Sequence, residues 1–312
     1  MARRPNKFGK REYKDDRDWV RYNEELVVRG TFYLDFSFAD NWETELKKMN
    51  DGKRGGQYKY PDSFMQYLSV WHQWMDYRGL EGVARTLERQ RIVLGSADYT
   101  TAWNRIHNFV PEIKLPSYRE LNLATDGTGA RARNSGRYLE LKYGRKGRDK
   151  YVVVIITVDV KHKKLLKIEA HVEGRGPSEP EVAIKHGKEL IGKGYKVNKF
   201  NGDGKYDTND NFEFWHKHKT RCAIPPRSNA KIRSTKCNWR KHEIRKFRKL
   251  GYKRWRKTRE YGDRLAAEGE NSGVKREFGE NLHSRNDDSL CAEAIQKFWA
   301  YDMLKSYGAM RM

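Results

Sequence analysis

Four residues near the C-terminus have types and spacing suited to binding a metal ion beside a phosphate. Tyr261, Arg264, Glu268 and Lys275 follow one another at separations of three, four and seven residues. Residues at these separations share one face of a helix. A carboxylate is a ligand for a hard cation, and cationic side chains bind phosphate oxygens. The pattern therefore favours metal-dependent chemistry on phosphate, although a solvated helix face carries similar charge pairs.

Two upstream acids come directly after segments that read as short strands. Asp126 follows residues 121–125, Asp203 follows the segment that begins at 196, and each acid has a glycine beside it that lets the chain turn. Functional groups in open α/β sheets gather at the carboxyl ends of strands. If these two strands are neighbours, the two acids lie together, and Glu268 reaches them from a helix packed against the sheet.

These residues resemble the catalytic motif of the DDE transposases of insertion sequences, with Asp126, Asp203 and Glu268 as the three acids. Four more segments are similar to the same family: Tyr22–Gly30, Tyr77–Gly82, Ala223–Ala230 and Val274–Glu280. The resemblance covers residues 17 to 307, approximately. It implies a ribonuclease-H-like α/β fold, in which a mixed sheet is flanked by helices and preceded by a mainly helical N-terminal DNA-binding region.

One departure from the family follows the third acid. Where the family usually has apolar or aromatic residues, this chain has Glu270 and Asn271. Glu270 is therefore a rival for the third carboxylate. We prefer Glu268, because only Glu268 has the expected spacing to both Arg264 and Lys275. The same departure is compatible with a weakened copy of the enzyme.

The resemblance implies two divalent ions, Mg²⁺ or Mn²⁺, in one active site, because such a pair can serve both oxygens of an in-line displacement. Asp126 is expected to bridge the ions, Asp203 to hold one and Glu268 the other. Three acids this close repel one another without metal, which predicts either a loose site or raised pKa values when no metal is bound. Arg264 and Lys275 are then expected to bind DNA phosphates.

The expected partner is double-stranded DNA, both the terminal inverted repeats of the element and the target. Tyr261 is expected to position the DNA end or to stack on a displaced base. Two ends must be cut together, which predicts a homodimer on DNA. We expect no nucleotide cofactor, because strand transfer exchanges one phosphodiester bond for another and no phosphate-loop signature is present.

The composition agrees with a polyanionic partner. The chain has 312 residues, with 65 Lys or Arg against 42 Asp or Glu, and a formal net charge of +23. No apolar run approaches the roughly 20 residues of a spanning helix, and residues 1–5 lead into no signal-peptide core. We therefore expect no membrane association and a cytoplasmic, nucleoid-associated protein. Three scattered cysteines predict no disulfide scaffold.

The N-terminal region, residues 1–116, reads as mainly helical. Residues 18–30 predict a helix and residues 31–38 a strand or extended segment. Helical spacing from 61, at 79–87 and at 98–109 makes residues 61–110 a helix-turn-helix candidate. Asp98 is the expected N-cap of the last helix, and Arg105 is its candidate DNA contact. An ordinary helical bundle with a basic rim is the alternative.

Residues 117–312 read as the catalytic domain. Strands are expected at 121–125, 138–143, 151–158, 164–172, 196–200 and 222–225, and helices at 178–191, 209–218 and 288–307. Ser178 and Glu181 predict a capping box. Asp207 is expected to cap the helix at 209–218, and Asp159 to be a turn residue.

A basic block precedes the Glu268 helix. Residues 217–259 contain 18 Lys or Arg and a single acid, and about 228–258 read as an insertion in the catalytic domain. Such a segment repels itself without a polyanion, which favours DNA contact over a solvated helix pair. The candidate DNA contacts in the block are Arg240, Lys241, Arg245, Lys246, Arg254 and Trp255.

Three other functions fit the same sequence. A non-catalytic DNA-binding protein descended from a transposase would keep the charge and the helical region but cleave nothing. A structure-selective nuclease would share the metal chemistry but give no strand-transfer product. RNA binding is a third alternative, which competition between duplex DNA and RNA would test.

Overall fold

The computed structural model describes residues 18–132, 150–233 and 235–310. The strand expected at 138–143 lies outside these ranges. The chain divides into two compact units: the described parts of 1–36 and 303–312, and residues 37–302. The domain boundary predicted at residue 116 lies inside the larger unit and stays a prediction.

The smaller unit begins with the predicted N-terminal helix, α1, Trp19–Thr31, capped by Asp18, whose carboxylate accepts from the Arg21 amide at 3.1 Å. The extended segment predicted at 31–38 is wrong. Short 3-10 turns replace it, Phe32–Leu34 in this unit and Ser37–Asn41 in the larger one. The aromatic side chains of this segment pack against individual rings instead. The Phe32 ring, for example, lies edge-on to the ring of Tyr307, with 5.4 Å between the centroids.

Four helices open the larger unit: α2, Trp42–Asn50, α3, Asp62–Trp71, α4, Tyr77–Arg89, and α5, Tyr99–Ile106. They enclose an apolar core in which Phe64, Leu68, Leu80 and Ile106 are fully buried. The predicted N-cap at Asp98 is confirmed, because its carboxylate accepts from the Thr101 amide at 2.7 Å. The predicted helix-turn-helix role of these helices remains a prediction.

Within the described residues, six strands form one mixed sheet: β1, Glu120–Ala132, β2, Tyr151–Asp159, β3, Lys164–Val172, β4, Lys196–Asn201, β5, Arg221–Ala223, and β6, Asn281–Leu282. Their order is β3-β2-β1-β4-β5, with β6 paired to β1. β2 is antiparallel to β1 and β3, while β4 and β6 are parallel to β1. The predicted ribonuclease-H-like fold is confirmed.

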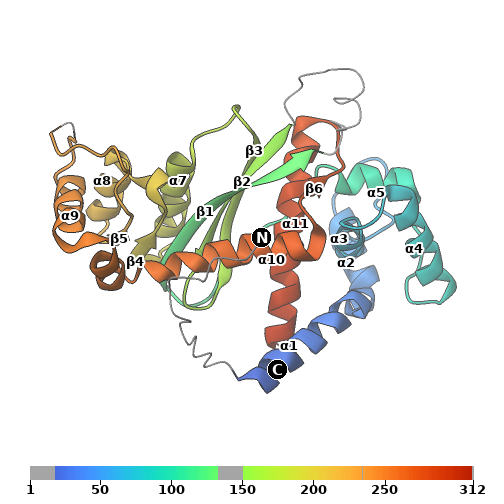
Figure 1. The fold of residues 1–312 in the computed structure, drawn as a ribbon. Coiled ribbons are helices and arrows are strands. Elements are labelled where there is room, and N and C mark those ends of the chain that lie inside the picture. Colours follow the sequence, from blue (N-terminus) through green and yellow to red (C-terminus); the bar gives the residue numbers. More distant parts are fainter. Residues whose placement is uncertain (1–17, 133–149, 234, 311–312) are drawn as a thin grey trace, which may run out of the picture. The chain divides into compact units, whose positions relative to one another are not determined.

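Helices flank this sheet (Figure 1). They are α7, Glu179–Gly192, α8, Asn209–Lys217, α9, Asn238–Arg259, α10, Leu265–Phe278, and α11, Asp287–Met310. The capping box predicted at Ser178 and Glu181 is confirmed. The prediction that Asp207 caps α8 is wrong. The Thr208 hydroxyl caps this helix and accepts from the backbone amide of Asn211 at 3.3 Å.

Within the larger unit, the first part of α11 connects the helical region to α10. The Gln296 amide donates to the carbonyls of Ile106 and Phe109, both at 2.8 Å. The Lys297 ammonium donates to the Phe278 carbonyl at the end of α10, also at 2.8 Å. The helix that carries Glu268 is therefore anchored at its C-terminus. Over the described ranges, no helix is long and apolar enough to cross a bilayer.

Candidate active site

Asp126 and Asp203 lie just past the point where the pairing of the parallel strands β1 and β4 ends. The pairing of β1 with β4 ends at Ala124 and Asn201. β1 continues as Asp126, still paired with Ile156 of β2, whereas the chain leaves β4 and turns at Asp203. The two acids predicted from strand-end position are therefore brought to one end of the sheet.

The Asp126 side chain faces α10. Its Oδ2 accepts a hydrogen bond of 2.9 Å from the Asn271 amide. Burial raises the pKa of Asp126 to about 6, and the negative charges of Asp203 and Glu268 act in the same direction. The Asn271 hydrogen bond and the Arg264 charge partly offset this rise. Mutual repulsion among the three acids thus contributes to the raised pKa, as predicted, but burial is the larger cause.

Asp203 begins a 3-10 turn, Gly204–Tyr206, and its Oδ1 accepts from the Lys205 backbone amide at 2.7 Å. This is the local hydrogen bond by which an aspartate stabilises a turn. The bond orients the carboxylate from its own backbone.

Glu268 lies in the first turn of α10 and pairs with Arg264, with 2.6 Å between Oε1 and Nη1. The prediction that Tyr261 and Arg264 share a helix with Glu268 is wrong. Both lie in a 3-10 turn, Tyr261–Arg264, that directly precedes α10. The left-handed conformation of Glu260 separates this turn from α9. Lys275 lies in the last turn of α10 and pairs with Glu280 at 3.2 Å.

A buried lysine of β4 holds this 3-10 turn against the sheet. The Lys199 ammonium donates to the Glu260 carbonyl at 3.1 Å and to the Asp263 carboxylate at 2.7 Å. The Arg264 guanidinium lies 5.5 Å from the Tyr261 ring centroid. Tyr261 itself is buried against Trp255, and burial raises the pKa of its hydroxyl to about 12. The phenol therefore stays protonated near neutral pH.

Sequence reasoning missed a fourth acid beside the site. The Glu179 carboxylate, at the start of α7, lies where a side chain on Gly127 would be: a Cβ there would come within 2.6 Å of the carboxyl carbon. Lys205 pairs with Glu179 at 2.8 Å, and the buried Tyr206 hydroxyl donates to the Glu179 carboxylate at 3.4 Å. No spacing rule marks Glu179, because a first-turn acid ordinarily serves only the helix dipole.

The predicted DNA contacts of α9 differ in exposure. Arg245 and Arg254 are exposed, and Lys241 and Lys246 are half-buried. Arg240 instead pairs with buried Asp207 at 2.7 Å.

Trp255 is fully buried and donates to Glu243 at 2.6 Å, so it packs in the core rather than on a DNA-facing surface. In α5, Arg105 pairs with Asp62 and donates to the Tyr60 carbonyl at 3.3 Å.

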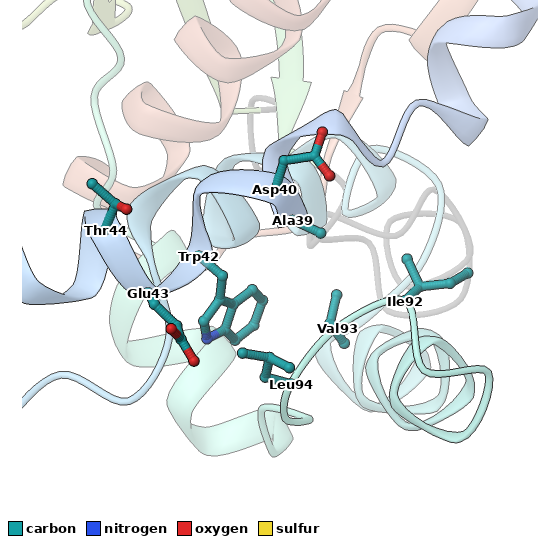
Figure 2. A pocket seen from close by; sticks show the side chains of 8 residues that line it. All are labelled: Ala39, Asp40, Trp42, Glu43, Thr44, Ile92, Val93 and Leu94. Atoms are coloured by element: carbon teal, nitrogen blue, oxygen red, sulfur yellow. The ribbon is translucent and has the colours of Figure 1, made fainter.

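The pocket of Figure 2 lies among the N-terminal helices and does not include the three acids. It has a volume of about 250 Å³ and is lined by Trp42, Val93 and Leu94 together with the acids Asp40 and Glu43. The two carboxylates make this lining unsuited to DNA phosphates. We therefore assign the chemistry to the sheet end rather than to this pocket.

The three acids carry the hard oxygen ligands that Mg²⁺ and Mn²⁺ prefer. Across the residues that the structure describes, no three or more His, Cys, Asp or Glu side chains are grouped closely enough to hold an ion. One buried acceptor favours an ion nonetheless: Asn271 Oδ1 has no hydrogen-bond partner within the described part of the chain. Water carried by a hydrated cation would satisfy it, so the residues fit such an ion.

Comparison with known families agrees with this geometry. Two family models, each described as a transposase DDE domain, match the chain. One covers residues 27–135 and the other residues 118–303. The second match spans the whole sheet and all three acids.

Proposed function

Since the chain belongs to the family of DDE transposases, we propose that it catalyses cut-and-paste transposition of an insertion sequence. It binds the terminal inverted repeats, cleaves the DNA at each end and joins the 3′-hydroxyls to target DNA. The observation that best supports this proposal is that Asp126 and Asp203 lie where the pairing of β1 with β4 ends, and that Asp126 contacts α10, the helix that carries Glu268.

Asp126, Asp203 and Glu268 are the residues we propose as ligands of two Mg²⁺ or Mn²⁺ ions. Such ions, when bound, lower the pKa of an attacking water or hydroxyl and stabilise the leaving oxygen. Asp126 has one oxygen tied to Asn271, which leaves its second oxygen for a ligand bond. To bind an ion, the Glu268 carboxylate must first release the ion pair that it forms with Arg264.

The cations beside the acids are proposed to bind the DNA backbone. Once Glu268 binds metal, Arg264 is left with an unpaired guanidinium next to the site, where it can bind a phosphate. Lys275 lies on the same helix, paired only with an exposed acid. Tyr261 is proposed to position the DNA end through its hydroxyl, because its ring is already packed against Trp255.

The exposed face of α9 is proposed as a track for the DNA duplex. Its candidate contacts are the exposed Arg245 and Arg254 and the half-buried Lys241 and Lys246. Arg105 and Arg240 would have to leave Asp62 and Asp207 to reach a phosphate. The proposed assembly is a homodimer on DNA, without a nucleotide cofactor, because two element ends are cut together.

The decisive experiment incubates the purified protein with Mg²⁺ or Mn²⁺ and labelled duplexes that carry its own element's ends. Glu268→Gln is tested in parallel, and Glu270→Gln, two residues later on α10, is the matched control. We expect the wild type and the control to cleave at the end and to form strand-transfer products. Glu268→Gln should bind the same DNA without cleaving it.

Each other outcome selects an alternative. Binding without cleavage by the wild type in either metal would favour a DNA-binding descendant. Cleavage without strand-transfer products would favour a nuclease. Cleavage by Glu268→Gln together with loss of cleavage by Glu270→Gln would move the third ligand to Glu270.

A further inference from the structure

Asn271 is the only residue whose side chain the described hydrogen bonds connect to Asp126. It lies on α10 three residues after Glu268, so the two side chains are neighbours on one helix face. Its amide donates to Asp126 Oδ2 at 2.9 Å. We propose that Asn271 is a positioning residue that orients the Asp126 carboxylate for a divalent cation, an inference that rests on the proposed function.

The hydrogen bond gives the two carboxylate oxygens of Asp126 different roles. Oδ2 is engaged by the amide, so Oδ1 is the oxygen left for an ion. The amide is a neutral donor and can remain in place when a cation arrives. Arg264 differs in this respect, since its charge competes with a cation for Glu268.

Asn271 also has a buried atom for which the described structure provides no partner. Asn271 is 6% exposed, and its Oδ1 accepts no hydrogen bond from the residues described. The donor to a carboxylate must be the NH₂ group, which leaves the carbonyl oxygen as an acceptor. A buried acceptor without a donor is costly. Mg²⁺ usually retains several waters, and one of these would supply the missing donor.

The backbone that carries Asn271 is held firmly. Gly273 packs against α11 so closely that a Cβ would come within 2.2 Å of the Tyr301 hydroxyl oxygen. Val274 and Phe278 of α10 are buried, and Lys297 donates to the Phe278 carbonyl at 2.8 Å. A donor on such a rigid element can fix a carboxylate in one orientation, as outer ligands do at metal sites.

The test measures Mn²⁺ binding directly, by titration calorimetry of the full chain without DNA. Asn271→Leu removes the donor at similar volume, and Asn271→Asp keeps the shape but places a second carboxylate against Asp126. Ser272→Ala, an exposed neighbour on the same helix, is the control. Thermal melting without metal reports whether each variant folds. The Mn²⁺ concentration at half-maximal cleavage is the second readout.

We expect Asn271→Leu to weaken Mn²⁺ binding about 10- to 100-fold, the usual effect of removing an outer-shell partner. The metal concentration for half-maximal cleavage should rise by the same factor, and Ser272→Ala should match the wild type. Folded Asn271→Leu that binds Mn²⁺ as tightly as the wild type would overturn the inference. Wild-type protein that binds Mn²⁺ but cleaves no DNA would instead contradict the proposed function and leave the role of Asn271 standing.

Discussion

The guanidinium of Arg264 lies 2.6 Å from the carboxylate of Glu268, so without metal the proposed third ligand is neutralised by its own neighbour. Metal must compete with this pair. Arg264→Gln is therefore expected to tighten Mn²⁺ binding about two- to fivefold, the worth of a partly exposed ion pair. Cleavage should nevertheless fall by about 100-fold or more, because a phosphate-binding cation has been removed.

Calorimetry and single-turnover cleavage measure these two quantities on the same preparation. Lys275→Gln is the matched control, since Lys275 pairs with Glu280 and not with a proposed ligand. It should lower cleavage without tightening Mn²⁺ binding. If Arg264→Gln weakened Mn²⁺ binding, the ion pair would be supporting the ligand rather than competing for it.

Much of the fold of the larger unit could be predicted from the sequence, because local patterns and tertiary packing agree there. The β-branched run Val152–Ile156 reads as a buried strand and forms β2, an interior strand between β3 and β1. Asp98 reads as an N-cap and caps α5. At residues 31–38 the alternating aromatics suggested a strand or extended segment. No strand in the described part of the chain pairs with them, and packing of individual rings decides the local structure.

The sequence predicted only those parts of the site that depend on the position of a residue after a strand or on the spacing between residues. The position of Asp203 after its strand and the proximity of the two acids follow from the sequence, and Glu268 follows from its spacing. The prediction that Asp126 ends its strand is wrong, because β1 continues through Asp126 to Ala132. Residue spacing could not reveal that Glu260 turns the chain between Tyr261 and α9. Nor could it reveal the Asn271 contact with Asp126, because a residue 145 positions away along the chain supplies the donor.

The exposed charges of α9 should determine DNA affinity, whereas its buried tryptophan should determine stability. Arg245→Gln with Arg254→Gln is expected to weaken binding and to reduce the slope of log affinity against log salt by about one for each phosphate that the variant no longer neutralises. Lys188→Gln, an exposed cation on α7, is the control. Trp255→Ala should instead cost about 3–5 kcal/mol of stability.

Filter binding at several salt concentrations and denaturant unfolding distinguish these effects. If the slope of log affinity against log salt were unchanged in the double variant, the DNA would not contact Arg245 and Arg254. If Trp255→Ala folded normally but bound DNA more weakly, the result would support the sequence-based prediction that Trp255 contacts DNA.

The close approach of Gly127 and Glu179 predicts a measurable coupling. Gly127→Ala would place a Cβ 2.6 Å from the Glu179 carboxyl carbon, so the acid and its partner Lys205 must shift. We expect a decrease of about 1–3 kcal/mol in the free energy of unfolding. Glu179→Ala opens the space, so the double variant should be destabilised by less than the sum of the two single effects.

Urea unfolding of the four proteins completes this cycle. Gly129→Ala is the control on the same strand, because its Cβ would lie 3.5 Å from the Tyr151 ring, an ordinary van der Waals distance. Additive effects at Gly127 and Glu179 would mean that the carboxylate does not occupy the position described.

The raised pKa of Asp126 predicts a pH-dependent stability in the absence of metal. Burial raises this pKa from 3.8 to about 6, so the folded state holds the proton more tightly than the unfolded state. The resulting stabilisation is fully present below about pH 4 and is lost as the pH rises through about 6. Asp126→Asn carries no such charge and should melt roughly 2–4 °C above the wild type at pH 8.

Thermal melts in chelator from pH 4 to pH 8 measure this difference directly. The advantage of Asp126→Asn should shrink as the pH falls from about 6 to about 4, since the wild-type carboxyl becomes neutral over that interval. Asp51→Asn, an exposed position, controls for the removal of one negative charge. A wild type that is equally or more stable at pH 8 would show that Asn271 and Arg264 offset the burial of the Asp126 charge in full.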